Sequence, residues 1–168
     1  MMTKPGDLYD MSKSGNLYSE DFVRWTEEQA ALLRRAKTAG TNLPLDWDNL
    51  AEEIDSLGQS NRRELRSQIT RILRHLLKLG ASPTVEPRAG WRNTILEARD
   101  EIEALLEDSP SLRREVEAMI AKQIVVAAKL AAGDLAAHGE PTERIKARLA
   151  GGFTADEVLG DWFPDAAS

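Results

Sequence analysis

The sequence predicts an all-α fold, a single-domain bundle of about five to six helices with a short C-terminal helix that folds back. Apolar residues recur at spacings of three and four along most of the chain, which is the pattern of one buried helix face. Capping residues, glycines and prolines separate these runs. No segment alternates apolar and polar residues with a period of two, so we expect no strands.

Length and composition fit one globular domain. Of the 168 residues, 42% are hydrophobic and 30% are charged, which is enough apolar material for a core. The absence of cysteine excludes disulfides, thiolate nucleophiles and cysteine metal sites. A net charge of −6 makes binding to nucleic acid unfavourable. We predict a flexible leader at residues 1–17, one helical domain at 18–164 and a tail at 165–168.

The sequence shows no secretory signal and no membrane span. The start has no apolar stretch after Lys4. The uncharged, mostly apolar run at residues 123–128 is far shorter than the ~20 residues that cross a bilayer. We therefore expect a cytoplasmic protein without membrane attachment.

The first two predicted helices are joined by a connector that contains Pro44. The first helix starts after Ser19, a favourable N-cap, and ends at Gly40. Asp46 caps the second helix. We favour an end or a bend at Gly58, because only proline is a poorer helix former than glycine. One continuous helix is the alternative, since the apolar stripe of Leu50, Ile54 and Leu57 stays in phase beyond the glycine.

The most apolar helix follows, and we expect it at the centre of the bundle. Its apolar face comprises Leu65, Ile69, Ile72, Leu73, Leu76, Leu77 and Leu79. Residues 80–90 contain two prolines and two glycines, which predicts a loop. Apolar spacing from Trp91 to Leu105 then predicts the next helix.

Ser109 followed by Pro110 predicts the start of the last long helix, because a cap and then a proline suit its first positions. A short helix at 144–149 comes next. Thr154 and Glu157 form a capping-box pattern for a final helix. We expect the closing sequence Trp162-Phe163-Pro164 to fold back onto the core.

Five strings follow one another along the chain: LYSEDFVRWTEEQAALLR, LDWDNLAEEIDSLG, HLLKLG, W-R-x-T-I at Trp91 to Ile95, and DSPSL. As a set they resemble the mostly bacterial domain-of-unknown-function family number twenty-nine. The tail FTADEVLGDWFP resembles the family's closing segment, so the resemblance covers residues 17–164. It implies a small helical protein and carries no activity, cofactor or catalytic residue. Leu79 and Gly80 depart from the family, which often has an aromatic residue or glutamine there.

Acidic residues crowd the segment 46–55, and Glu52, Glu53 and Asp55 are candidates for acid–base chemistry together with His75. A carboxylate and a histidine in a bundle, here Glu53 and His75, can hold a metal ion. The alternative is that the acids pair with arginines and that His75 forms a hydrogen bond at the rim of the core. The missing E-x-x-H spacing favours this alternative.

Six basic residues and one acid lie between Arg62 and Lys78. This face is a candidate for binding an anionic ligand or a phosphate backbone, with Arg71, Arg74 and Lys78 as contacts. No aromatic residue interleaves with it, and no glycine-rich phosphate loop is present. The alternative is that the arginines pair with acids of neighbouring helices, such as those at 97–103.

Arg88, Trp91 and Arg92 form a second candidate anion site. Arginine beside tryptophan can hold a planar anion by stacking and by a forked hydrogen bond. The alternative is that Trp91 anchors the loop to the core and that Arg92 pairs with a nearby acid.

No nucleophile motif such as G-x-S-x-G is present, and no motif indicates a cofactor. The leading hypothesis is a noncatalytic helical module that interacts with a protein partner or with itself. The second is a small metal-dependent or acid–base enzyme that uses Glu52, Glu53, Asp55 and His75. The third is an anionic-ligand or nucleic-acid binder through the Arg62–Lys78 face.

Overall fold

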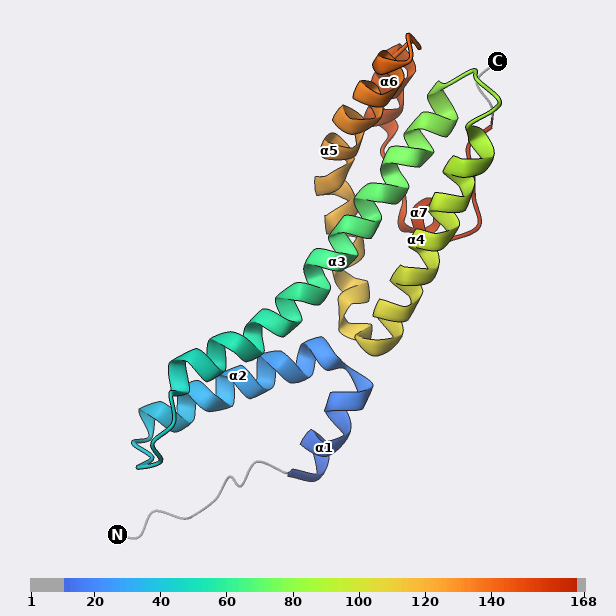
Figure 1. Ribbon diagram of the computed structural model, residues 1–168. Helices are drawn as coiled ribbons and strands as arrows, with labels where there is room; N and C mark the ends of the chain where they lie inside the picture. The colour runs from blue at the N-terminus through green and yellow to red at the C-terminus, as the bar shows by residue number, and fades with distance from the viewer. Residues whose placement is uncertain (1–10, 166–168) are drawn as a thin grey trace. The chain divides into compact units, whose positions relative to one another are not determined.

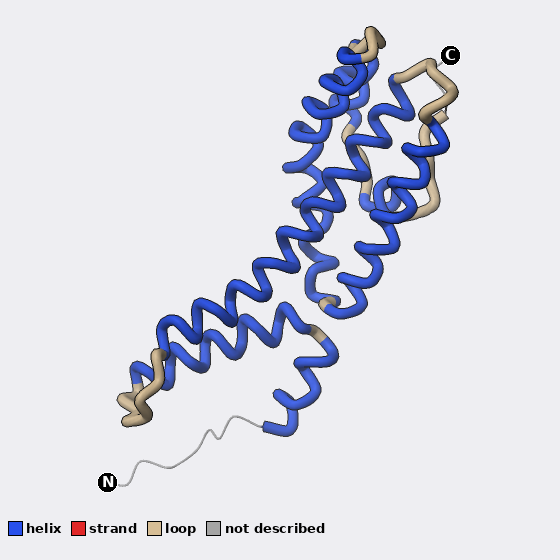
Figure 2. Tube along the Cα trace, in the orientation of Figure 1, coloured by secondary structure: helices blue, strands red, loops and turns tan. Residues whose placement is uncertain are grey.

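The computed structural model describes residues 11–165, and side chains from residue 16 onward (Figure 1). All regular elements in this range are helices, as Figure 2 shows, which confirms the predicted all-α fold. In chain order they are α1 (Met11–Glu20), α2 (Phe22–Thr38), α3 (Trp47–Ala81), α4 (Arg88–Asp108), the 3₁₀ helix η1 (Pro110–Glu115), α5 (Val116–Ala137), α6 (Glu143–Gly151) and α7 (Ala155–Leu159). None of these helices is both long and apolar enough to span a membrane.

Contacts between residues define two compact units. Unit 1 comprises the chain up to Asn61 together with Glu107–Ser111. Unit 2 comprises Arg62–Leu106 together with the chain from Leu112 onward. Helix α3 therefore contributes its first part to unit 1 and its second part to unit 2.

Helix α1 begins inside the range predicted as a flexible leader. Residues 11–17 of that range are helical, whereas residues 1–10 lie outside the described range. The aromatic rings that follow give the end of α1 a local anchor. The ring of Tyr18 packs edge-to-face on the ring of Trp25, with centroids 4.8 Å apart.

The N-cap of α2 is Asp21, and the predicted cap at Ser19 is wrong because Ser19 lies within α1. The Asp21 carboxylate accepts a hydrogen bond from the Arg24 N–H (3.0 Å), as an N-cap does. It also accepts hydrogen bonds from the N–H and the hydroxyl of Ser111, both at 2.8 Å. One buried side chain thus starts α2 and ties it to the 107–111 stretch of unit 1.

Helix α3 runs unbroken through Gly58, so the favoured end or bend is wrong and the continuous alternative is right. Gly58 is buried, and a Cβ at this position would overlap the hydroxyl of Thr26 on α2. The missing side chain therefore allows α2 and α3 to approach closely in unit 1. The same helix pair is joined by an ion pair between Arg34 and Asp55.

Unit 2 is built on large apolar side chains. The second part of α3 lies alongside α4 and α5 (Figure 1). Its large, fully buried side chains are Leu65, Ile69, Ile72, Leu73, Leu76, Leu79, Ile95, Ile102, Leu112, Leu135 and Val158. They include most of the apolar face predicted for the central helix, which is confirmed.

The loop predicted at residues 80–90 is shorter than expected. Helix α3 continues to Ala81, and α4 already begins at Arg88. Pro87 directly precedes α4, where its missing N–H costs no helical hydrogen bond. Proline therefore ends the connector here and does not prevent the helix that follows.

The start of the last long helical stretch at Ser109 and Pro110 is confirmed, but its first part is the 3₁₀ helix η1, and α5 begins only at Val116. Ser109 is fully buried, and its hydroxyl oxygen accepts a hydrogen bond from the Val23 N–H (3.2 Å). Its side chain therefore joins the 107–111 stretch to α2 within unit 1.

The two short C-terminal helices occur where they were predicted. Gly152 follows α6 with a φ of +66°, a conformation that glycine adopts without strain. The capping box of α7 is complete, because the Thr154 hydroxyl accepts from the Glu157 N–H and the Glu157 carboxylate accepts from the Thr154 N–H.

The C-terminal segment folds back, as predicted, and Arg99 of α4 holds it. The guanidinium of this residue, which is only 7% exposed, donates hydrogen bonds of 2.8–3.0 Å to the carbonyl oxygens of Glu157, Val158 and Trp162. It also lies 4.8 Å from the centre of the Phe163 ring. The closing aromatic residue therefore rests on a buried cation.

Candidate functional site

The three acidic candidates lie on the first part of α3, in unit 1. Glu52 and Glu53 are exposed to solvent. Asp55 is half-buried and pairs with Arg34 of α2, as the alternative interpretation predicted for this carboxylate. Nearby, Asp48 forms a similar ion pair with Lys37.

The fourth candidate, His75, lies in unit 2. About six turns of α3 separate it from Glu53, so the helix does not bring the two side chains together. Its Nδ1 is 2.9 Å from the carbonyl oxygen of Arg71, and burial lowers its pKa. Among residues 11–165, no group of three or more histidine, aspartate and glutamate side chains is placed to hold a metal ion.

Arg74 and Lys78, two of the predicted anion contacts, share one carboxylate. Arg74 donates two hydrogen bonds to Asp134 of α5 (2.6 and 2.8 Å), and the Lys78 ammonium lies 3.0 Å from the same group. The Arg74 hydrogen bond, with the Lys78 contact, lowers the pKa of Asp134 to about 2. The positive charges of Arg74 and Lys78 are therefore both directed at Asp134 within the protein.

Of the other arginines of this face, one forms an ion pair and three are exposed to solvent. Arg62 forms an ion pair with Glu115 of η1 (3.0 Å). Arg63, Arg66 and Arg71 remain exposed. The pairing alternative is thus realised in part, but the acids come from η1 and α5 and not from the 97–103 segment of α4.

The second predicted anion site does not assemble either. Arg88 donates hydrogen bonds to the carbonyl oxygens of Leu79 and Ser82 (2.9 and 3.2 Å), at the C-terminal end of α3. The guanidinium of Arg92 lies 4.7 Å from the Phe163 ring. Trp91 is half-buried, with the ammonium of Lys78 4.5 Å from its ring centre. These side chains have separate partners and no common centre.

A cleft of about 620 Å³ opens beside Trp91, and we call it the Trp91 cleft. It lies in unit 2, among the end of α3, the 82–87 connector, the start of α4 and the end of α5. The charged, titratable and apolar side chains that line it are Lys78, Glu86, Pro87, Trp91, Asp134, Leu135, His138 and Glu140. Its volume falls within the roughly 300–1,000 Å³ of small-molecule sites.

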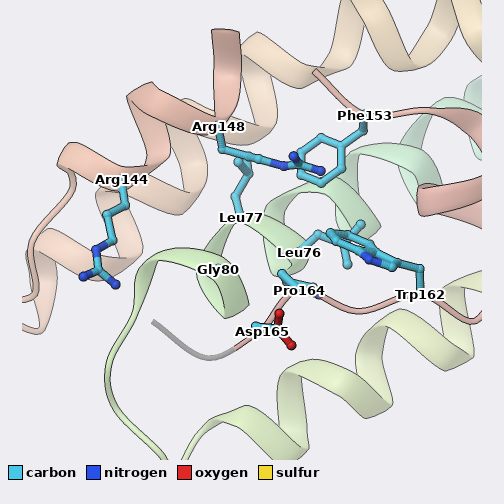
Figure 3. Close-up of a pocket in the computed structure, with 9 residues that line it drawn as sticks. All are labelled: Leu76, Leu77, Gly80, Arg144, Arg148, Phe153, Trp162, Pro164 and Asp165. Carbon is cyan, nitrogen blue, oxygen red and sulfur yellow. The ribbon is translucent and has the colours of Figure 1, made fainter. Parts of the chain in front are cut away.

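A smaller pocket of about 220 Å³ lies against the C-terminal segment (Figure 3). The guanidinium of Arg148 is 4.5 Å from the Phe153 ring centre and 5.4 Å from that of Trp162. Its charge is paired with Glu157 (2.5 Å). Figure 3 shows Arg148 against the Phe153 ring, whereas Arg144 extends away from both rings. The charge of Arg148 is therefore already neutralised by a neighbour inside the protein.

One exposed apolar surface lies on the first part of α3. We call Leu50, Glu53 and Leu57 the acidic stripe, because these residues are neighbours on one helix face. Leu50 is 40% exposed and Leu57 is 47% exposed. Five acids and no base occur in residues 46–57. The stripe therefore combines uncovered leucines with negative charge.

A second exposed apolar surface lies on α5, in unit 2. We call it the basic patch, and it consists of Lys122, Val125, Val126, Lys129 and Leu130. Val125 is 67% exposed and Val126 is 48% exposed. Leu130 also borders a groove of about 380 Å³ whose other wall contains Arg63, Arg66 and Arg71 of α3.

The fold and the sequence both have counterparts among known proteins. An α-helical protein of unknown function from Rhodospirillum rubrum, solved by crystallography, has a similar fold with a TM-score of 0.68. The two sequences are 24% identical, and the similarity covers 86% of this chain and 89% of that one. This likeness shows the class of the protein, an all-α fold.

The family description "Domain of unknown function DUF29" matches residues 17–148, and the chain belongs to this family. The match confirms the resemblance seen in the sequence strings. It ends before the FTADEVLGDWFP tail, so it does not extend to that part of the resemblance. No curated protein matches the chain.

Sequence reasoning missed two features of these surfaces. Asp134 was not singled out, although it is the only acid between Ala118 and Ala137 and an isolated carboxylate in an apolar helix needs a counter-ion. Leu50 and Leu57 were assigned to a buried stripe, and their exposure left no trace in the apolar spacing.

Proposed function

We propose that the protein is a noncatalytic helical interaction module that associates with a second copy of itself. The acidic stripe of one copy packs on the basic patch of the other. The observation that supports this is the pair of exposed apolar surfaces with opposite charge. Such apolar surfaces with polar rims are typical of protein–protein contacts.

The acidic stripe has the properties of a helix face that lacks a neighbour. Leu50 and Leu57 stand one heptad apart, as do side chains that pack against a partner helix. Glu53 lies between them and forms no ion pair with a described residue, whereas Asp48 and Asp55 are paired. Its negative charge is therefore available to a partner.

The basic patch matches this face in spacing and in charge. Lys122, Val126 and Lys129 follow one another at four and three residues, so they line one side of α5. No acid lies between Ala118 and Gly133. The exposed Arg63 and Arg66 of α3 add positive charge at the neighbouring groove. Opposite charges then fix the register of the two apolar surfaces.

Light scattering coupled to size exclusion tests the proposal on the full chain. We expect a dimer or larger species at about 100 µM protein and about 20 mM salt, with weaker association at about 500 mM salt because the ion pairs are screened. The variant Leu57→Lys should abolish association. The control Leu96→Lys changes a leucine of similar exposure (44%) on α4 and should leave association intact.

Charge reversal gives a sharper test. Glu53→Lys and Lys129→Glu should each weaken association by roughly tenfold, and the double variant should restore it, because the complementary pair is then reversed. A monomer at every concentration and salt would contradict the proposal. The proposal would also be contradicted if the losses in association caused by the two single substitutions simply added up in the double variant. The two side chains would then not face each other.

A duplex DNA added in the same experiment separates the charged alternatives. If the Arg62–Lys78 face is a nucleic-acid site, DNA binding should fall steeply with salt and should be insensitive to Leu57→Lys. Such a result, without self-association, would replace the present proposal.

A further inference from the structure

The Trp91 cleft contains cations whose charge is already neutralised. Lys78 is only 8% exposed, and its ammonium contacts Asp134 at 3.0 Å and lies over the Trp91 ring. Arg74 occupies the remaining side of the same carboxylate with two hydrogen bonds. An anion that enters the cleft therefore meets a lysine that is held between a carboxylate and an indole.

Two carboxylates of the cleft have no cationic partner in the part of the chain that the structure describes. Glu140, in the connector that follows α5, is half-buried and accepts a hydrogen bond from the Ser82 hydroxyl. Glu86, in the connector between α3 and α4, is exposed. Neither of them forms an ion pair with any residue of the described range. The uncompensated charge of the walls is therefore negative.

The apolar part of the cleft is provided by three side chains. Leu135 is buried, and Pro87 and Trp91 are half-buried at the opposite wall. These groups exclude water from the hydrocarbon part of a ligand, while the carboxylates attract its cationic end. The combination fits a short hydrocarbon that carries a protonated amine.

We propose that the Trp91 cleft binds a small organic amine in its ammonium form. The ammonium group lies near Glu140 and Glu86, and the hydrocarbon part contacts Leu135, Pro87 and the edge of Trp91. The proposed ligand is a cation, whereas the sequence predicted an anion at Lys78 and Trp91. It does not depend on self-association, because no residue of the cleft belongs to the acidic stripe or the basic patch.

Isothermal titration calorimetry with matched probes tests the sign of the ligand. The probes are 1,4-diaminobutane and 2-phenylethylamine, with 1,4-butanediol and succinate as the neutral and anionic counterparts. We expect both amines to bind, and the diol and the diacid to bind at least tenfold more weakly. Affinity for the amines should fall as salt is raised.

Two substitutions locate the site. Glu140→Gln keeps the shape of the side chain and an oxygen that can accept from Ser82, so the fold is retained while the charge is lost. It should weaken amine binding by about tenfold or more, as expected for a hydrogen bond to a charged group. Glu86→Gln should weaken binding less, because that carboxylate is more exposed. The control Glu97→Gln alters an exposed acid of α4 that does not line the cleft, and should change nothing.

The proposal is overturned if the amines do not bind, or if the diol binds as well as 1,4-diaminobutane. Stronger binding of succinate, abolished by Lys78→Met, would restore the anion site predicted from the sequence. Amine binding that is unchanged in Glu140→Gln and Glu86→Gln would place the ligand elsewhere on the acidic protein surface.

Discussion

The two units of this protein bury very different side chains. In unit 1 the buried positions of α2 and of the first part of α3 hold valine, threonine, alanine and glycine, at Val23, Thr26, Ala30, Ala51 and Gly58. In unit 2 they are mostly leucine and isoleucine from three long helices. Since stability follows buried apolar area, the large buried side chains of unit 2 give it a core of its own, whereas the buried side chains of α2 and of the first part of α3 are smaller.

The largest expected effect comes from removing one leucine of the same helix in each unit. Leu73 of α3 is fully buried in unit 2, so Leu73→Ala should cost about 2–5 kcal/mol of the free energy of unfolding. Leu57→Ala should cost less than about 1 kcal/mol at low protein concentration, because nearly half of that side chain is exposed. Urea denaturation followed by circular dichroism measures both. Equal losses would contradict the contrast between the units.

An ion pair in each unit gives the next effect. Asp134→Asn in unit 2 should cost about 2 kcal/mol at pH 7, because Arg74 lowers the pKa of this carboxyl from 3.8 to about 2. A lowered pKa means that this stability is present above pH 4 and is lost as the pH falls through 2. The variant and the parent should therefore converge in acid. Asp48→Asn, in the exposed pair with Lys37, should change stability little at any pH.

The smallest effect concerns the close approach of α2 and α3 in unit 1. Gly58→Ala should destabilise the protein by roughly 1 kcal/mol, because the overlap with the Thr26 hydroxyl outweighs the better helix propensity of alanine. In a Thr26→Ala background the obstacle is removed, and the same substitution should stabilise by up to about 1 kcal/mol. Thermal unfolding of the parent, the two single variants and the double variant tests this. A stabilising effect in both backgrounds would mean that Gly58 does not set the helix spacing.

Much of the fold follows from the sequence, because the spacing of apolar residues depends on local helix geometry. The long helices, the capping box at Thr154 and the helical start at Pro110 were predicted in this way. Gly58 was misread, since glycine in a helix can mean a break or a close contact, and only the neighbouring Thr26 decides between them. Pro87 was misread for a similar reason, because proline can either end a helix or precede one.

The candidate sites were less predictable, because charges find partners far away in the chain. Arg74 and Asp134 are 60 residues apart in sequence, and nothing local indicates that they meet. Exposure is equally hidden. Leu50 and Leu73 belong to equally regular apolar patterns, and what distinguishes them is whether another helix covers them. The roles of the residues predicted to act as acids, bases or anion contacts thus depend on neighbours that are distant in the sequence.

Amide hydrogen exchange at two protein concentrations tests the central claim most directly, namely that the uncovered side of unit 1 is completed by a second copy of the chain. Between about 5 µM and about 200 µM, protection should rise at residues 50–57 of α3 and at 122–130 of α5, and should stay constant elsewhere in the described helices. Exchange that is independent of concentration at both segments would contradict the account.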